Sequence, residues 1–232
     1  MHTRLWAAAP LAVGFLLTAG SLSTQAAPAT TKGTWYGTNG TDGTLRGRDS
    51  SGNPVNLLDS GAPNSALKYV YDTDRDITWL ADWDVNGPMN WTAANTWASS
   101  LTDFGGGWRL PSSLNADGTG PCGPSFNCTG SEMGHIWYSE LGNTVGSLTN
   151  TGPFSNLQPG DYWSGTEYAP STLYAWHFST FNGFQDFVAK YDAYAVAVRP
   201  GDVFAGSAPE PGTLALLGLG LAGLAAARRR KQ

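Results

Sequence analysis

The sequence has little of the chemistry that most enzymes and nucleic-acid-binding proteins carry. Charged residues make up 13% of the 232 residues, and there are only three histidines and two cysteines. The sequence contains no Gly-x-Ser-x-Gly elbow, no phosphate-binding loop, no His-Glu-x-x-His and no dinucleotide fingerprint. No familiar motif therefore nominates a nucleophile, a zinc protease site or a nucleotide site.

Basic residues are scarce between the two ends of the chain. Residues 27–208 hold eight Lys and Arg against 17 Asp and Glu, a net charge of −9. Nucleic acid requires a basic footprint on its partner, and anionic lipid also attracts positive charge. The composition therefore argues against both partners, and it favours an extracellular protein or one that holds cations.

Long apolar runs are missing except at the two ends. At the N-terminus, Arg4 precedes an apolar run over residues 6–19, and small residues follow up to Ala26. This order of charge, apolar run and small residues is typical of a secretory signal peptide. We predict that residues 1–26 are removed by signal peptidase after Ala26.

At the C-terminus, residues 212–227 carry no charge and are mostly Leu, Ala and Gly. The run is shorter than the roughly 20 residues that a stable membrane-spanning helix prefers. Four basic residues follow it, Arg228, Arg229, Arg230 and Lys231. The positive-inside rule keeps such residues in the cytoplasm, so one interpretation is an ordinary C-terminal membrane anchor.

A second interpretation uses the motif Pro209, Glu210, Pro211, which directly precedes this run. Together with the short apolar helix and the basic end, the motif resembles the PEP-CTERM sorting signal. The resemblance implies processing by an exosortase in a Gram-negative bacterium that makes extracellular polysaccharide. It also implies transit through the inner membrane on the C-terminal helix, followed by delivery to the cell surface or the extracellular matrix.

Turn residues are abundant in the rest of the chain, which has 30 Gly and 14 Pro in all. We divide the chain into a signal peptide over residues 1–26, a turn-rich β extension over 27–66, a folded domain over 67–202, a linker over 203–208 and the sorting signal over 209–232. Runs rich in aromatic and β-branched residues predict strands at residues 44–48, 54–58, 67–71, 77–81, 162–168, 172–179, 184–190 and 194–200. Both faces of the last run are apolar, which indicates a central buried strand.

A first helix is predicted over residues 91–101. Trp91, Ala94, Ala98 and Leu101 recur there at helical spacing. Asn90 or Thr92 lies near its N-cap.

A second helix is predicted over residues 132–141. Thr129 and Glu132 have the spacing of a capping box, and Gly142 is typical of the position just past a helix end. His135 lies beside the apolar face and is expected at the surface or hydrogen-bonded. The predicted buried face consists of Met133, Ile136, Trp137 and Leu141. Two helices followed by a small antiparallel sheet predict an α+β fold.

Five stretches in order, GGWRLPS, EMGHIWYSELGN, YWSGTEY, AWHF and AVAVRPG, resemble the Lcl C-terminal domain family. The similarity runs from about Tyr69 to Asp202. It implies a compact C-type lectin-like domain with two short helices and a twisted antiparallel sheet. The family's distant formylglycine-generating relatives use a cysteine-based copper site, but Cys122 and Cys128 do not correspond to it in position.

Four residues are predicted to bind a ligand: Trp163, Glu167, Trp176 and His177. Aromatic rings with polar neighbours make good platforms for sugars. The alternative is that most of the tryptophans fill the core and that His177 is structural. Glu140 and Glu167 are also the acids best placed for a glycosidase-type carboxylate pair, and solvated or ion-paired carboxylates are the alternative there.

The stretch DWDVNG places Asp82, Asp84 and Asn86 at alternate positions before Gly87, like the front half of a calcium loop. Ala93 stands where the bidentate Glu of an EF-hand would be, which excludes a standard EF-hand. Calcium is therefore the one cofactor that the sequence suggests, with a polar turn before the first helix as the alternative.

Cys122 and Cys128 are the two cysteines of the chain. Export would place them in an oxidising compartment, which predicts a short disulfide. A copper or zinc site is the alternative, but it lacks nearby histidines or further cysteines.

Taken together, these patterns predict an exported surface or matrix protein, most simply a non-enzymatic module that binds exopolysaccharide or a protein partner. Two alternatives stay open: an enzyme acting on polysaccharide or on a partner protein, and a purely structural matrix component. The fold alone does not separate them, because one fold can host binding and catalysis alike.

Overall fold

Two antiparallel sheets and two short helical regions make up the computed structural model, which describes residues 43–59 and 61–204. The strands are β1 (Leu45–Arg48), β2 (Pro54–Val55), β3 (Leu58–Asp59), β4 (Ala62–Pro63), β5 (Tyr69–Asp72), β6 (Ile77–Leu80), β7 (Met89–Asn90), β8 (Asp161–Glu167), β9 (Tyr174–Ser179), β10 (Gln185–Ala189), β11 (Asp192–Ala193) and β12 (Val198–Pro200). The helical segments are α1 (Trp91–Ser100), the 3-10 turn η1 (Asp103–Gly105), α2 (Glu132–Gly134) and the π-turn η2 (His135–Glu140).

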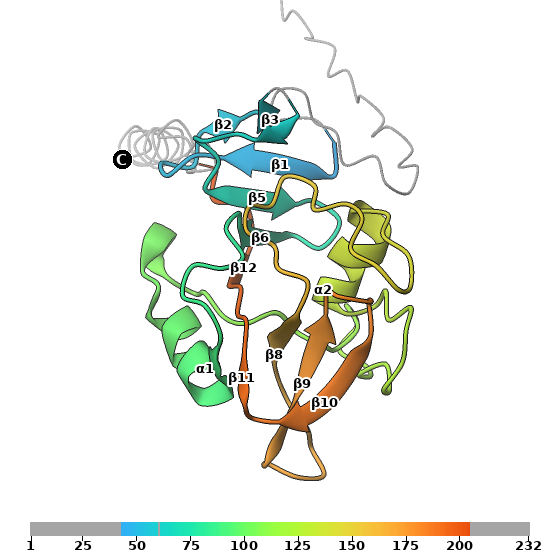
Figure 1. Ribbon diagram of the computed structural model, residues 1–232. Helices are drawn as coiled ribbons and strands as arrows, with labels where there is room; N and C mark the ends of the chain where they lie inside the picture. Colours follow the sequence, from blue (N-terminus) through green and yellow to red (C-terminus); the bar gives the residue numbers. More distant parts are fainter. Residues whose placement is uncertain (1–42, 60, 205–232) are drawn as a thin grey trace, which may run out of the picture.

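The larger sheet has the strand order β12-β6-β5-β1-β2, and the smaller one has the order β10-β9-β8. Two short pairs, β11 with β7 and β3 with β4, complete the topology. Figure 1 shows the larger sheet above the smaller one, with α1 on the left and α2 on the right. This arrangement of strands with two short helices confirms the predicted α+β fold.

The described part of the predicted β extension shares the larger sheet with the residues that follow it. Strand β1, predicted at residues 44–48, lies between β2 and β5. Gly47 is required there, because a Cβ at this position would lie 2.4 Å from the Val55 carbonyl oxygen. Leu45 and Leu57 are at most 2% exposed, so this segment contributes to the main core.

The prediction of a central strand at residues 194–200 is wrong. Only Val198–Pro200 forms a strand, and it lies at the edge of the larger sheet. The segment is nevertheless buried, because the backbones of Val198 and Arg109 exchange two hydrogen bonds of 2.8 Å on the side away from β6. A covered edge strand and a central strand therefore have the same apolar pattern in the sequence.

The first helix agrees with its prediction. It covers Trp91–Ser100, and the Asn90 side chain accepts a hydrogen bond from the Ala93 amide at 3.0 Å. Ala94 and Ala98 are fully buried, and their small side chains let the helix pack closely onto the protein.

The second helix differs from its prediction in two ways. Its N-cap is Ser131, which accepts from the Gly134 amide at 3.2 Å, and not Thr129. After a single α-turn the chain widens into the π-turn η2, in which the Leu141 amide bonds the Ile136 carbonyl. The predicted apolar face is at most 2% exposed, but His135 and Glu140 are also buried, so the segment is enclosed on more than one face.

Aromatic side chains form the centre of the main core, where the two sheets meet. The Trp79 and Trp83 rings stack with centroids 5.4 Å apart. Phe154 and Tyr162 pack against Trp83 at 5.0 and 5.3 Å. Each of these rings is at most 1% exposed, so together they hold the sheets with a large buried apolar area.

Cys122 and Cys128 form a disulfide, and their Cα atoms are 5.7 Å apart. The loop they close is fastened to β10 by two 3.0 Å backbone hydrogen bonds between Ser125 and Gln185. No helix within residues 43–204 is long and apolar enough to cross a membrane. The predicted signal peptide and sorting tail lie outside the described residues.

We predict that Gly134→Ala lowers the free energy of unfolding by about 2–3 kcal/mol, although alanine is the better helix former. The added Cβ would lie 2.0 Å from the Cys128 carbonyl oxygen, a backbone atom that cannot move freely. Gly123→Ala is the matched control, because a Cβ there meets nothing within 4 Å. Urea unfolding followed by tryptophan fluorescence measures both variants, and equal stabilities would contradict the prediction.

Candidate binding groove

A groove of about 620 Å³ opens where the β5–β6 turn, α1, the loop after η1, the start of α2 and β8 come together. Its floor includes apolar side chains such as Ile77 and Leu110. Its polar side chains come from distant parts of the sequence and are Arg75, Asp76, Asn95, Arg109, Ser112, Asn115, Glu132 and Thr166. The volume is in the range of typical ligand pockets.

Arg109 and Glu132 form a bidentate salt bridge in this groove. The Arg109 guanidinium donates to both carboxylate oxygens of Glu132, at 2.6 and 2.8 Å, and the Ser112 amide donates to the same carboxylate at 2.7 Å. The bond to Glu132 raises the pKa of Arg109, while burial opposes it. Glu132 is 13% exposed and Arg109 41%, so the arginine presents more of its surface to a ligand.

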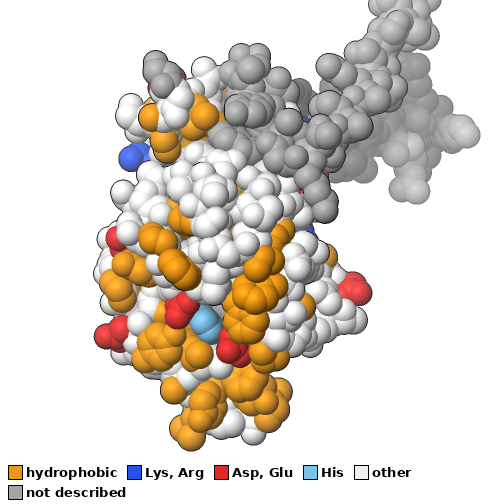
Figure 2. All heavy atoms as spheres, turned by 45° about the vertical axis from the view of Figure 1, so that its right-hand side comes forward, with side chains coloured by type: hydrophobic (Ala, Val, Ile, Leu, Met, Phe, Trp, Pro, Cys, Tyr) orange, Lys and Arg blue, Asp and Glu red, His pale blue; other side chains and the backbone are white. Residues whose placement is uncertain are grey.

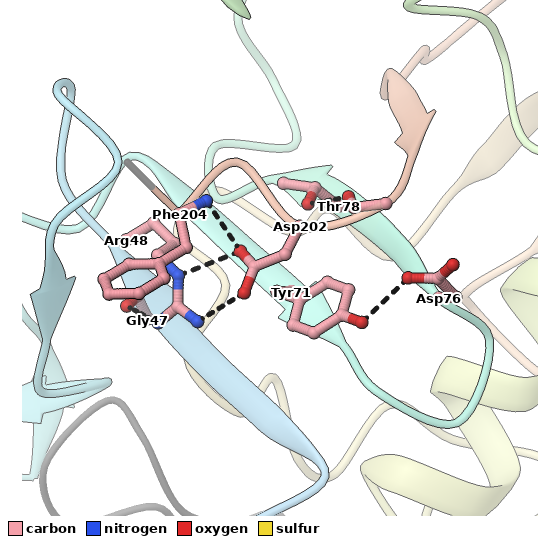
Figure 3. A network of polar contacts seen from close by, with 8 residues as sticks. Gly47, Arg48, Tyr71, Asp76, Thr78, Asp202 and Phe204 are labelled. Atoms are coloured by element: carbon pink, nitrogen blue, oxygen red, sulfur yellow. Dashed lines mark hydrogen bonds and ion pairs between the residues drawn. The ribbon is translucent and has the colours of Figure 1, made fainter. Parts of the chain in front are cut away.

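Asp76 lies on the turn between β5 and β6 and is held by Tyr71, whose hydroxyl donates to it at 2.8 Å (Figure 3). Burial and then this hydrogen bond raise the pKa of Tyr71 to about 12, so the hydroxyl remains a donor. In the same network, Arg48 donates twice to Asp202, at 2.7 and 2.9 Å. This pair fastens the chain beyond β12 to β1.

Two further polar side chains in the groove are held by single hydrogen bonds. Arg75 donates to the Thr129 carbonyl at 2.8 Å, and the Asn95 amide nitrogen donates to the Trp91 carbonyl at 2.9 Å. The Asn95 bond fixes the amide but does not use its Oδ1 atom, which can accept from a ligand.

An irregularity in β8 builds one wall of the groove. The ladder between β8 and β9 shifts register between Trp163 and Glu167. The freed Gly165 amide donates to the Pro111 carbonyl at 2.8 Å, and the Thr166 hydroxyl accepts from the Ser113 amide at 3.1 Å. As bulges often do, this one redirects the strand, here toward the 109–118 loop.

The arrangement around Glu132 favours binding over acid–base catalysis. Both oxygens of Glu132 accept hydrogen bonds from protein donors, so this carboxylate is held as an ion-pair partner and not as a free base, while Asp76 accepts one hydrogen bond from Tyr71. The charges of Arg109 and Glu132 cancel. What remains is a set of fixed donors and acceptors, which suits a polar ligand without strong charge.

None of the residues predicted to bind a ligand lines this groove. Trp163 is fully buried, and its indole nitrogen donates to the Met89 carbonyl at 2.9 Å. Trp176 is 5% exposed, so neither indole offers a ring face to solvent. Glu167 is exposed and forms an ion pair with Lys190, whose ammonium lies 3.9 Å from the Trp91 ring centre.

His177 is buried and lies beside Asp161, with 3.5 Å between its Nδ1 atom and an Asp161 carboxylate oxygen. The Tyr191 hydroxyl donates to the other oxygen at 2.8 Å. His177 contributes most to lowering the pKa of Asp161 to about 2, Tyr191 and Ser179 add to it, and burial opposes them. The 3.5 Å contact is long for a hydrogen bond, so the firm bond is the one from Tyr191.

The predicted calcium residues lie in the loop before β7. Asp82 accepts from the Asp84 amide at 3.0 Å and from Asn156 at 3.1 Å, while Asn86 is exposed. Trp83 between the two acids points into the core. This local turn is compatible with the polar-turn alternative, and calcium binding stays a prediction.

Apolar side chains form several groups over the lower half of the face shown in Figure 2, with acidic and histidine side chains between them. Tyr168, directly after β8, stacks on Phe187 of β10 with centroids 3.7 Å apart, and both are half-buried. Tyr174, which is 38% exposed, packs edge-on against Phe187. These rings form an aromatic surface that does not include the predicted Trp163 and Trp176, which are buried.

Sequence reasoning missed the groove residues. Arg109 lies in a stretch without helical or strand periodicity, and Glu132 was assigned to a capping box that does not form. Asn95 lies on the predicted α1, but nothing in the helix marks it as part of a site. One available signal was the unusual run of three glycines before Arg109, which indicates a loop held in a special conformation.

Comparison with known proteins adds one finding at the C-terminus. Residues 207–231 match the PEP-CTERM protein-sorting motif. The match supports export to the cell envelope or surface through an exosortase. No curated protein matches the chain.

Asp161→Asn is expected to lower the free energy of unfolding by roughly 1 kcal/mol at pH 7, a value reduced because the carboxylate is partly exposed. The folded-state pKa of about 2 lies below the ordinary value of 3.8, so this stabilisation is complete above pH 4 and disappears as the pH falls toward 2. The difference in the free energy of unfolding between the variant and the unchanged protein, measured at several pH values, should therefore shrink between pH 4 and pH 2. Asp59→Asn on the exposed β3 is the control, and a constant difference across this range would contradict the assignment.

Proposed function

We propose that this chain is an exported surface or matrix protein, sorted by an exosortase, whose folded domain binds extracellular polysaccharide in the groove around Arg109. The PEP-CTERM match supports the export and sorting. The binding role is supported by a single observation, a groove of about 620 Å³ whose polar side chains are already fixed by protein hydrogen bonds.

The chemistry of the groove favours a sugar polymer over other ligands. Sugar hydroxyls both donate and accept, and they pair well with amide, carboxylate and guanidinium groups. Since Arg109 and Glu132 neutralise each other, the groove has no excess charge that would select a phosphate or a metal ion. A pre-fixed site also loses little side-chain entropy on binding, which supports affinity for a flexible polymer.

The runner-up ligand is a surface protein. Protein interfaces are flat and larger, and they depend on aromatic anchors at their centre. The groove is concave, and the aromatic residues Tyr168 and Tyr174 are not among its lining residues. We therefore favour the polysaccharide. The presence of two short helices and antiparallel sheets is compatible with the C-type lectin-like fold of the Lcl resemblance, which we retain as part of this proposal.

We predict that Asn95→Ala weakens binding of the mature protein to the exopolysaccharide of the producing bacterium about tenfold, because a fixed hydrogen-bonding group is lost from the groove. Thr96→Ala, the neighbouring exposed position outside the groove, should bind as the unchanged protein does. Isothermal titration calorimetry with the purified polysaccharide measures both.

The outcomes of this titration are separable. No saturable binding by the unchanged protein would reject the polysaccharide, and equal affinities of the two variants would reject the groove. Repeating the titration with a chelator, and then with calcium added back in excess, tests the predicted calcium loop of Asp82, Asp84 and Asn86, since only a calcium-dependent site would regain its affinity when calcium is restored. Release of new reducing ends during the titration would favour the enzymatic alternative.

Replacing Pro209, Glu210 and Pro211 by alanine should block exosortase processing, so that the chain accumulates in the producing cells with its C-terminal segment attached. Mass spectrometry of the intact protein reads the processed and unprocessed forms. Thr96→Ala is the control and should be processed normally. Normal processing of the triple variant would contradict the role assigned to the motif.

A further inference from the structure

A buried group of two carboxylates and one imidazole lies between the larger sheet and the π-turn. The Nε2 atom of His135 is 3.2 Å from Glu140 Oε1 and 3.6 Å from Asp72 Oδ2. These ligand atoms all lie within 4.8 Å of one another, and the three residues are between 0 and 9% exposed. Within residues 43–59 and 61–204, this is the one group of three His, Cys, Asp or Glu with such spacing.

The π-turn is what places His135 and Glu140 together. In an α-helix, residues five apart point about 140° away from each other around the axis, because one turn takes 3.6 residues. In a π-turn the repeat is closer to five residues, so the two side chains share one side. Such turns are rare and recur at functional sites. The π-turn is therefore the departure from α-helical geometry that brings the side chains of His135 and Glu140 to the same side.

Protein donors hold the outer oxygen of each carboxylate. The Thr44 hydroxyl donates to Glu140 Oε2 at 2.6 Å. The Asp74 and Arg75 amides donate to Asp72 Oδ1 at 3.0 and 3.1 Å. The remaining oxygens, Glu140 Oε1 and Asp72 Oδ2, face the imidazole. Outer partners orient the ligands of metal sites in this manner.

Two of the atoms that face the centre of this group have no hydrogen-bond partner. Asp72 Oδ2 and His135 Nε2 are both inaccessible to solvent and unpaired, and their separation of 3.6 Å is too long for a hydrogen bond. Unpaired polar atoms that are fully buried are costly and rare in folded proteins. A bound cation would satisfy all three side chains at once.

We propose that Asp72, His135 and Glu140 form a binding site for a divalent first-row transition-metal ion, with Zn²⁺ as the best fit. A tetrahedral zinc ion with bonds of about 2.0–2.1 Å separates its ligands by about 3.3 Å, and the separations of 3.2 and 3.6 Å bracket this value. One imidazole with two carboxylates suits zinc, iron or manganese, whereas calcium and magnesium take oxygen ligands.

The ion would fasten the end of β5 to the π-turn. Three protein ligands leave the fourth tetrahedral position to water, and His135, with 11% of its side chain exposed, is the member closest to solvent. None of the three residues lines the groove, so the site is separate from the proposed polysaccharide site. Since the ion would bind the folded state alone, it would act as a structural clip that stabilises the domain.

The test uses the mature protein without a histidine tag, stripped with a chelator and then titrated with Zn²⁺. We expect one equivalent bound per chain and a thermal midpoint raised by about 5–10 °C at 100-fold excess over the dissociation constant. Co²⁺ in place of Zn²⁺ should give visible absorption bands typical of a four-coordinate site. No uptake and no shift in the midpoint would reject the site.

Asp72→Asn separates a metal site from a structural ion pair. The variant keeps the shape of the side chain and the acceptor for the Asp74 and Arg75 amides. In a metal site, the metal-free variant is at least as stable as the metal-free parent, yet zinc affinity falls at least tenfold. If the three residues form only an ion pair, the metal-free variant is less stable than the metal-free parent, and zinc changes the stability of neither protein. His177→Gln is the matched control and should retain one equivalent of zinc.

Discussion

The packing of aromatic rings around Trp83 is the constraint on which the rest of the structure depends. Trp79 comes from the larger sheet and Tyr162 from the smaller one, and both contact the Trp83 ring. Within the described residues, no ladder and no isolated backbone bridge pairs a strand of the larger sheet with a strand of the smaller one. The buried rings must therefore supply most of the attraction between the sheets, and a single Trp→Ala change in such a core costs about 3–5 kcal/mol.

Around this core the chain runs through long loops that are held by polar side chains. Asn143 shows the principle, because its amide oxygen accepts from the backbone of Thr149 and Asn150 while its nitrogen donates to the Asn150 carbonyl. The backbone N–H and C=O groups of such loops have no partners in a helix or a sheet, so Asn, Asp and Thr side chains form hydrogen bonds with them instead. The turn-rich composition of the sequence thus reflects order, and it provides rigid loops on which a groove can be built.

Two polar sites result from this architecture, and they differ in how charge is compensated. In the groove, Arg109 and Glu132 neutralise each other at the surface, which leaves fixed hydrogen-bonding groups for a neutral ligand. Under the π-turn, Asp72 and Glu140 face one imidazole in a buried environment, and Asp72 Oδ2 and His135 Nε2 lack hydrogen-bond partners. The first arrangement suits reversible binding of a polymer. The second suits a tightly held cation that supports the loops from within.

The sequence by itself determined the features that depend on contiguous residues. Three such features are the sorting motif at residues 207–231, the α1 helix with its Asn90 cap, and the alternation of apolar residues in most strands. Each depends on residues that are neighbours along the chain, either through the repeat of the backbone or through recognition of a short linear motif. The buried face of the second helix was also readable. Its π-turn was not, since the wider turn depends on contacts such as that between Glu140 and Thr44, which are far apart in sequence.

Only the tertiary structure decided where the polar sites lie. Strand β12 has the pattern of a central strand, yet it is an edge strand that the Arg109 loop covers. Trp163 and Trp176 were candidates for a sugar platform and are buried in the core. Asp72 and His135 meet only because β5 and the π-turn pack against each other. Local patterns report which face of an element is apolar, whereas the partners of a polar group are set by long-range packing.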